Sequence, residues 1–174
     1  NFFCTSPVCS PARASLFTGK IPSQHGVLDW IREGNDGEDC ISYLSGHTGY
    51  TEFLQAAGYT CGLSGKWHLG CSHVPQMGMS HWYAHQKGSD HYYHAPMYRD
   101  GVLERDPGYV TDLITDDAVE FMRARHAADD RFYCGVHYTA PHGPWGRDEH
   151  PADVRTLYAD CEFPTCPREP FHPL

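Results

Sequence analysis

The stretch Cys9-Ser10-Pro11-Ala12-Arg13-Ala14-Ser15-Leu16-Phe17-Thr18-Gly19-Lys20 places a cysteine, a helix start and fixed cations in one short segment. Ser10 followed by Pro11 predicts an N-cap with proline at the first helical position, and Gly19 predicts the end of this helix. Cys9 would then precede a helix N-terminus, where unpaired N–H groups and the helix dipole favour an anion. Arg13 follows one turn later and would lie over Cys9. The pattern indicates a reactive site, although a cysteine in this position is also commonly a small buried residue.

A second stretch carries cations directly after a predicted strand: Gly58-Tyr59-Thr60-Cys61-Gly62-Leu63-Ser64-Gly65-Lys66-Trp67-His68-Leu69-Gly70. Alternate residues of an extended chain point the same way, so Lys66 and His68 could converge on one ligand. His142 lies in a loop after another predicted strand, at the strand end where open α/β sheets bind ligands. A purely structural role for His142, as a residue placed by turn chemistry, stays an alternative.

These segments together resemble the type I sulfatases. C-x-P-x-R followed by A-S-L-x-T-G-[K/R] resembles the first signature of that family, in which the cysteine is oxidised to formylglycine. Residues 58–70 resemble the second signature, and Ala140-Pro141-His142-Gly143-Pro144 resembles the segment that carries an active-site histidine. The resemblance implies an α/β fold, the alkaline-phosphatase-like sandwich with a largely parallel central sheet and helices on both faces. Residues 1–174 would be part of the N-terminal catalytic domain, truncated at both ends.

The resemblance also implies a role for each matched residue. Cys9, converted to formylglycine, would hydrate to a gem-diol, of which one hydroxyl attacks the sulfur of a sulfate ester and the other expels sulfate by regenerating the aldehyde. Arg13 and Lys66 would hold this residue and stabilise charge, and His68 would assist proton transfer at the diol. His142 would contact the sulfate or protonate the leaving oxygen.

The implied cofactor is a Ca²⁺ or Mg²⁺ ion, which would polarise the sulfate. Within this chain the one family-matched metal ligand is Cys9 as formylglycine, and the remaining ligands are expected outside it. We therefore expect residues 1–174 alone to bind metal weakly and to lack activity. The expected partners are a sulfated small molecule or carbohydrate as substrate and a formylglycine-generating maturation enzyme that recognises C-x-P-x-R.

Composition narrows the class of partner and the compartment. The 13 basic and 22 acidic residues give a net charge of −9, which argues against nucleic acid and against an anionic membrane surface as main partners. No apolar run approaches the ~20 residues of a membrane span. The eight cysteines lack C-x-x-C pairs, a pattern typical of free thiols in a reducing compartment, which slightly favours the cytoplasm although the true N-terminus is not visible. The thirteen histidines fit no compact set of metal ligands.

Local patterns predict a helix over 48–57, a strand over 59–64, an amphipathic helix over 111–127 and a buried strand over 132–138. Residues 71–108 have weak periodicity and are long for a loop, which indicates a functional insertion. Several of its side chains either line a substrate pocket or pack in the interior: Trp82, Tyr83, Lys87, Tyr92 and Tyr93.

Two other functions remain open. A phosphoester or phosphonate hydrolase of the same superfamily would bind a tetrahedral anion in a similar pocket, and a Cys/His-rich binding module would need no catalysis. The modification motif at Cys9 favours the sulfatase over the first, and the specificity of that motif disfavours the second. The identity of the sulfated substrate does not follow from the sequence.

Overall fold

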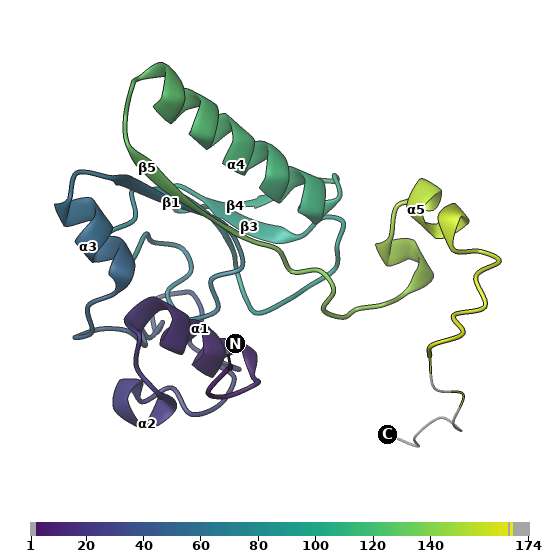
Figure 1. Ribbon diagram of the computed structural model, residues 1–174, viewed down its shortest axis with the longest axis horizontal. Helices are drawn as coiled ribbons and strands as arrows, with labels where there is room; N and C mark the ends of the chain where they lie inside the picture. Colours follow the sequence, from purple (N-terminus) through teal and green to yellow (C-terminus); the bar gives the residue numbers. More distant parts are fainter. Residues whose placement is uncertain (1–2, 167, 169–174) are drawn as a thin grey trace.

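A five-stranded mixed sheet forms the centre of the computed structural model, which describes residues 3–166 and 168 (Figure 1). Its strands are β1 (Thr60–Gly65), β2 (His81–His85), β3 (Pro96–Arg99), β4 (Val102–Arg105) and β5 (Phe132–His137), in the spatial order β4-β3-β2-β1-β5. β1 pairs in parallel with both β2 and β5, whereas β3 and β4 join through antiparallel pairs. Four of the five strands therefore run in one direction, and the largely parallel sheet predicted from the sequence is confirmed.

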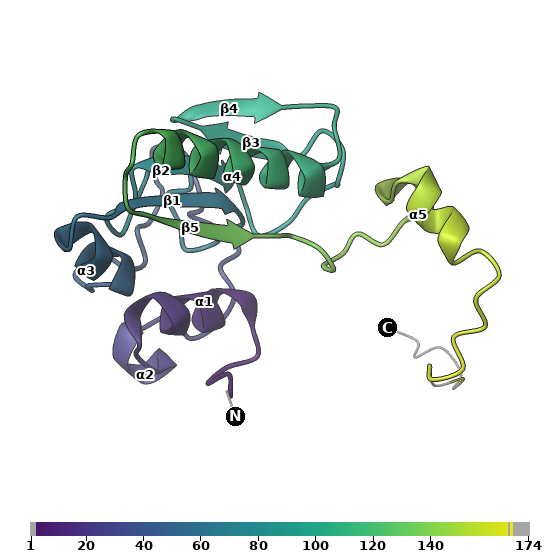
Figure 2. The same cartoon turned by 45° about the horizontal axis from the view of Figure 1, so that its top comes forward.

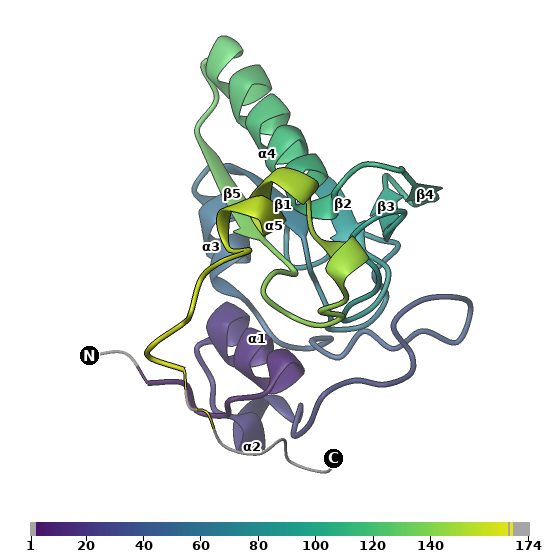
Figure 3. The same cartoon turned by 90° about the vertical axis from the view of Figure 1, so that its right-hand side faces the viewer.

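Helices cover both faces of this sheet, as predicted. They are α1 (Cys9–Thr18), α2 (Pro22–His25), α3 (Tyr50–Ala56), α4 (Val110–Ala127) and α5 (Ala152–Leu157), with a 3₁₀ turn η1 (Arg147–Glu149). α4 packs on one face, and α1 and α3 lie on the opposite side, an arrangement that Figure 3 shows with the sheet between α4 and α1. α5 lies apart from these layers in Figures 1 and 2. Among the described residues, no helix is long and apolar enough to cross a membrane.

The side chains of β1 alternate between two apolar layers. Leu63 packs with Phe17 and Trp67 on the side of α1. The next residue, Ser64, points to the other side and donates a hydrogen bond from Oγ to the carbonyl of Ile114 in α4 (2.9 Å). A strand buried on both faces is typical of the centre of a parallel sheet. Packing on both faces therefore holds β1 in place, and it fixes the position of the backbone at Lys66, the next residue.

The predicted elements around β1 agree with the structure, but the segment 71–108 does not. It contains β2, β3 and β4, which extend the sheet, so its interpretation as one long functional insertion is wrong. Trp82, Tyr83 and Tyr92 are almost fully buried in the two apolar clusters, which favours packing over a pocket lining for these three. These strands are only four or five residues long, too short for a clear two-residue alternation to stand out in the sequence.

The start of α1 also differs from the prediction. The N-cap is Val8, so Cys9 is the first helical residue. Ser10 is fully buried, and its Oγ accepts a hydrogen bond from the N–H of Ile31 (3.1 Å) instead of capping the helix. The hydroxyl of Ser10, which the local pattern predicted to cap the helix, is instead used in a tertiary contact with Ile31. Gly19 ends the helix in the left-handed conformation (φ 67°), as predicted.

The cysteines are not all free thiols. Cys40 and Cys71 form a disulfide, so the prediction of unpaired cysteines is wrong for these two. The preference for a reducing compartment, and with it for the cytoplasm, depended on unpaired cysteines and loses its basis. Among the described residues the remaining six are free, including Cys9.

A buried carboxylate ties α4 to the sheet. Asp117 is 4% exposed and accepts hydrogen bonds from His81 Nε2 (2.9 Å) and Arg99 Nη1 (2.6 Å). Burial by itself would raise the pKa of Asp117, but these two donors lower it on balance. This carboxylate therefore contributes stability while it is ionised.

We expect Asp117→Asn to lower the free energy of unfolding by roughly 2–4 kcal/mol, between the value of one hydrogen bond to a charged group and that of a buried pair. The folded-state pKa is depressed, so the stabilisation is fully present above the ordinary Asp value of about 4 and is lost as the pH falls through the folded-state pKa. Urea unfolding of both proteins between neutral and acid pH measures this. A stability difference that does not shrink in acid would contradict the assignment.

Candidate active site

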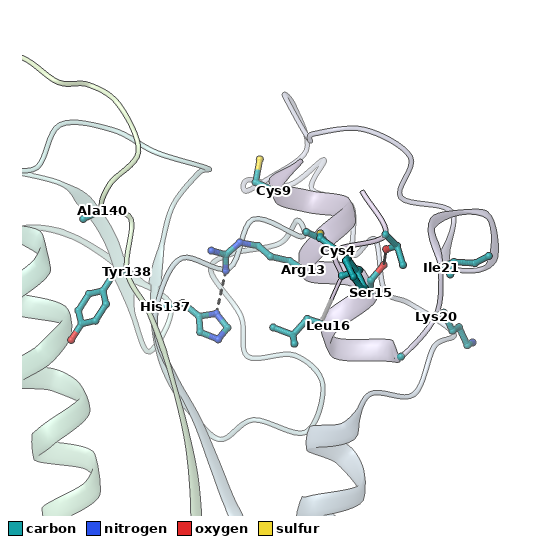
Figure 4. A pocket seen from close by; sticks show the side chains of 14 residues that line it. Cys4, Cys9, Arg13, Ser15, Leu16, Lys20, Ile21, His137, Tyr138 and Ala140 are labelled. Carbon is teal, nitrogen blue, oxygen red and sulfur yellow. Dashed lines mark hydrogen bonds between the residues drawn. The ribbon is translucent and has the colours of Figure 1, made fainter. Parts of the chain in front are cut away.

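The helix α1 meets the carboxyl ends of β1 and β5 through Arg13, one turn after Cys9. Its Nη1 donates a hydrogen bond to the carbonyl of Lys66 (2.7 Å) and another to Nδ1 of His137 (3.2 Å), as Figure 4 shows for the second contact. Nδ1 of His137 also lies 3.2 Å from the carbonyl of Lys66, so it accepts from Arg13 in one tautomer and donates to Lys66 in the other. The backbone N–H of Lys66 in turn donates to the carbonyl of His137 (2.7 Å). The two signature segments are thus joined at one point.

Gly65 permits this junction. A Cβ atom at this position would lie 2.0 Å from the carbonyl oxygen of His137, and the backbone has φ 115°, which side chains rarely tolerate. The ends of β1 and β5 can therefore approach closely enough for Lys66 and His137 to share Arg13.

A cavity of about 860 Å³ opens beside this junction. Its lining includes Cys9 and Arg13 from α1 and His137 from β5, and Figure 4 shows these side chains together with Lys20 at the far end of α1. Tyr138 also lines it, but its hydroxyl turns towards α4, where it bonds to Thr115 (2.9 Å). Cys9 is half-buried at the helix start, so the predicted nucleophile faces an accessible space that can hold a small ligand.

Two cations lie near Cys9: Arg13, which lines the cavity, and Lys66, which is buried and does not line it. Burial lowers the pKa of Arg13 to about 10, while the neighbouring Cys9 opposes the shift. Burial and then the charge of Arg13 lower the pKa of Lys66 to about 8, with Cys9 again acting in the opposite direction. At neutral pH Arg13 is charged and Lys66 is largely so. Cys9 therefore lies beside two cations at a helix N-terminus, a setting that favours an anionic ligand.

His68 is buried close enough to this pair to feel its charge, but it does not line the cavity. Its Nε2 donates to the carbonyl of Ile31 (2.8 Å), and its Nδ1 is buried with no hydrogen-bond partner among the described residues. Burial lowers the pKa of His68 to about 4, against the effect of that hydrogen bond, and the charges of Lys66 and Arg13 lower it further. The imidazole is therefore neutral at physiological pH, and the lone pair on its Nδ1 accepts no hydrogen bond from the described residues.

His142 is not brought into this group by any contact in the described part of the chain. It is exposed on the loop after β5, and its Nδ1 bonds to the carbonyl of Gly143 (2.8 Å). Its own carbonyl accepts a hydrogen bond from the buried hydroxyl of Tyr92 (2.7 Å), which anchors the loop. His142 does not line the cavity. Its predicted role therefore stays a prediction.

Sequence reasoning missed His137, which was interpreted only as part of a strand. Burial, and then the charge of Arg13, lower the pKa of His137 to about 4, so it is a neutral group beside a cation. A histidine at the carboxyl end of a buried strand was the available signal. That signal becomes specific only once β5 is known to pair with β1, where His137 aligns with Gly65.

The described residues do not by themselves form a metal site. Residues 3–166 and 168 hold no group of three or more His, Cys, Asp or Glu side chains arranged to bind an ion. A hard divalent cation needs about six oxygen ligands. The side chains at the junction are mainly cationic or neutral nitrogen groups, which fit an anion better than Ca²⁺ or Mg²⁺.

Comparison with known proteins shows which proteins the chain is similar to. The model of the protein family described as Sulfatase matches residues 1–165. The N-acetylglucosamine-6-O-sulfatase of Bacteroides thetaiotaomicron is 32% identical over 149 residues, which cover 83% of this chain and 24% of that protein. The N-acetylgalactosamine-6-sulfatase of Mus musculus is 28% identical over 171 residues, covering 83% of this chain and 32% of that protein.

The fold is shared with a solved structure, BT4656 in complex with its substrate D-glucosamine-2-N,6-O-disulfate. The two superpose with a TM-score of 0.75 and 28% sequence identity, over 94% of this chain and 30% of the other. The chain thus spans about a quarter to a third of the length of the relatives it matches. The family match over residues 1–165 includes all five strands and both segments that meet at Arg13.

Proposed function

Because the chain belongs to the sulfatase family, matched over residues 1–165, we propose that the protein hydrolyses a sulfate monoester with Cys9, converted to formylglycine, as its nucleophile. The observation that supports this most is the junction at Arg13, which links the Cys9 helix to Lys66. Cys9 and Arg13 thus line one cavity, and Lys66 lies close to both. A hydrated aldehyde at position 9 would supply the hydroxyl that attacks sulfur.

The chain's own residues would bind and polarise the sulfate. Arg13 and Lys66 would neutralise the charge that grows on the sulfate oxygens in the transition state, and Arg13 is already held in place by its hydrogen bond to the carbonyl of Lys66. His68 is neutral and its Nδ1 accepts no hydrogen bond among the described residues, and on the strength of the motif around it we propose that it assists proton transfer at a hydroxyl of residue 9. His142 is proposed to protonate the leaving oxygen, on the strength of the motif around it.

The substrate class is proposed from the relatives. Two curated relatives are named for 6-sulfated amino sugars, and the similar solved structure holds a sulfated glucosamine. We therefore propose a sulfated hexosamine, as a free sugar or within a carbohydrate chain. Maturation would need a formylglycine-generating enzyme as a partner.

Ca²⁺ or Mg²⁺ is proposed as cofactor of the intact enzyme only. The described residues do not fit a complete site, and Cys9 as formylglycine would be their one contribution to it. The roles proposed for the residues of this chain do not require the metal.

Peptide mapping by mass spectrometry tests the modification. After production together with a formylglycine-generating enzyme, the Cys9 peptide is expected to lose its sulfur and to react with aldehyde reagents, while the Cys161 peptide keeps a thiol. The intact enzyme, matured in the same way, should release sulfate from a 6-sulfated hexosamine faster than phosphate from the matching phosphate ester. A free thiol at Cys9 in every molecule would contradict the proposal, and faster phosphate release would favour the phosphoester hydrolase.

A further inference from the structure

The segment 31–43 crosses from α1 to the residues that follow β1, and we call it the strap. At its first residue it makes two buried contacts with the site. The N–H of Ile31 donates to Ser10 Oγ (3.1 Å), next to Cys9, and the carbonyl of Ile31 accepts from His68 Nε2 (2.8 Å). One peptide segment therefore touches both the nucleophile helix and His68.

Further contacts fasten the strap along its length. The carbonyl of Asn35, a buried residue, accepts from the N–H of Ser72 (2.7 Å), and the N–H of Tyr43 donates to the carbonyl of Leu69 (3.3 Å). Asp36 Oδ2 accepts from two side chains, that of Gln86, just after β2 (2.5 Å), and that of Tyr98 in β3 (3.0 Å). The disulfide Cys40–Cys71 adds a covalent link in the middle of this row.

The backbone under the strap has an unfavourable shape. His68 and Cys71 both have positive φ, at 57° and 44°, a conformation that is unfavourable for a residue other than glycine. At Gly70 (φ 81°) a Cβ atom would lie 1.7 Å from the carbonyl oxygen of Ile41 in the strap. Such a conformation persists only when surrounding contacts determine it. The strap supplies those contacts on one side, and Gly88 lies against the His68 ring on another.

The contact with Ile31 also selects the tautomer of His68. A carbonyl oxygen can only accept, so the proton must be on Nε2 of His68 and the lone pair on Nδ1. Nδ1 is buried and has no partner among the described residues. If the strap moved away, Nε2 would lose its acceptor and either nitrogen could carry the proton.

We propose that the strap is a positioning element for His68, locked in place by the Cys40–Cys71 disulfide, so that the site is competent only in the oxidised form. The catalytic consequence rests on the proposed function, whereas the structural consequence does not. A dithiol would release the lock by reducing the disulfide with two electrons: the S–S bond breaks, two thiols form at Cys40 and Cys71, and the dithiol is oxidised to its own disulfide. Cys40 is partly exposed, so a reductant can reach it.

Two kinds of measurement on the intact, matured protein test this. The nitrogen NMR signals of His68 report which ring nitrogen holds the proton, and steady-state kinetics report kcat and KM. For Cys40→Ser/Cys71→Ser, and for the native protein in dithiothreitol, we expect the single Nε2–H signature to be replaced by a mixture. We expect kcat to fall by about 10²-fold, as a misplaced catalytic group causes, with a smaller change in KM. Removing dithiothreitol and reoxidising should restore both.

The matched control is Cys161→Ser/Cys166→Ser, which removes two exposed thiols far along the chain and should change neither readout. An unchanged His68 signature after complete reduction would overturn the proposal. So would global loss of the circular dichroism spectrum on reduction or in the double variant, because the disulfide would then hold the whole fold and not the strap. If the His68 signature depended on the disulfide and the protein yet had no sulfatase activity, that result would support the structural role of the strap and refute the proposed function.

Discussion

Replacing Cys9 with alanine is expected to abolish sulfate-ester hydrolysis, with kcat falling on the order of 10⁴-fold or more, as the loss of a nucleophile does in other hydrolases. The reason is chemical, because alanine can be neither oxidised to an aldehyde nor hydrated. The fold should be kept, since Cys9 is the first residue of α1 and alanine is the best helix former. Sulfate release and the circular dichroism spectrum measure the two effects separately.

Cys161→Ala is the matched control, because Cys161 is an exposed free thiol outside the cavity. It should leave both turnover and the spectrum unchanged. Sulfate release by Cys9→Ala at the native rate would remove Cys9 from the mechanism and leave the cavity as a binding site only. Loss of the folded spectrum in Cys9→Ala would instead show that the thiol has a structural role at the start of α1.

Replacing His142 with alanine is expected to slow the hydrolysis of alkyl sulfates, such as sugar 6-sulfates, by roughly 10²–10⁴-fold while aryl sulfates with good leaving groups react nearly as before. A poor alcohol leaving group needs a proton from a general acid, whereas a phenolate does not. In the structure Nδ1 of His142 donates to the carbonyl of Gly143, so its Nε2 is the atom that would carry the transferred proton. The ratio of kcat values for the two substrate classes measures the effect.

His137→Ala is the informative comparison, since His137 lines the cavity and His142 does not. If His137→Ala slowed alkyl sulfates more than aryl sulfates and His142→Ala did not, the general acid would be His137. Equal slowing of both substrate classes in His142→Ala would point to sulfate binding instead of proton transfer. His126→Ala, an exposed histidine at the end of α4, serves as the control without expected effect.

Much of the fold follows from short-range pattern. The helix predicted over 111–127 is α4, because its apolar spacing of three and four residues and its charged ends depend only on near neighbours. The strand over 132–138 and the helix over 48–57 agree with β5 and α3 within two residues at each end. The strands β2 to β4 were not predicted, because their order comes from pairing with one another and not from a pattern within each.

The sequence by itself determined the chemistry of the site: Cys9 at a helix start, Arg13 one turn later and Lys66 after a buried strand. Only the tertiary structure decided that Arg13 bonds to residues 53 and 124 positions away, at Lys66 and His137. It also decided which of eight cysteines pair, and that Ile31 fixes the ring of His68. Helix and strand patterns record only the few residues around each position, whereas these contacts depend on which strands lie side by side and on where an irregular segment crosses them.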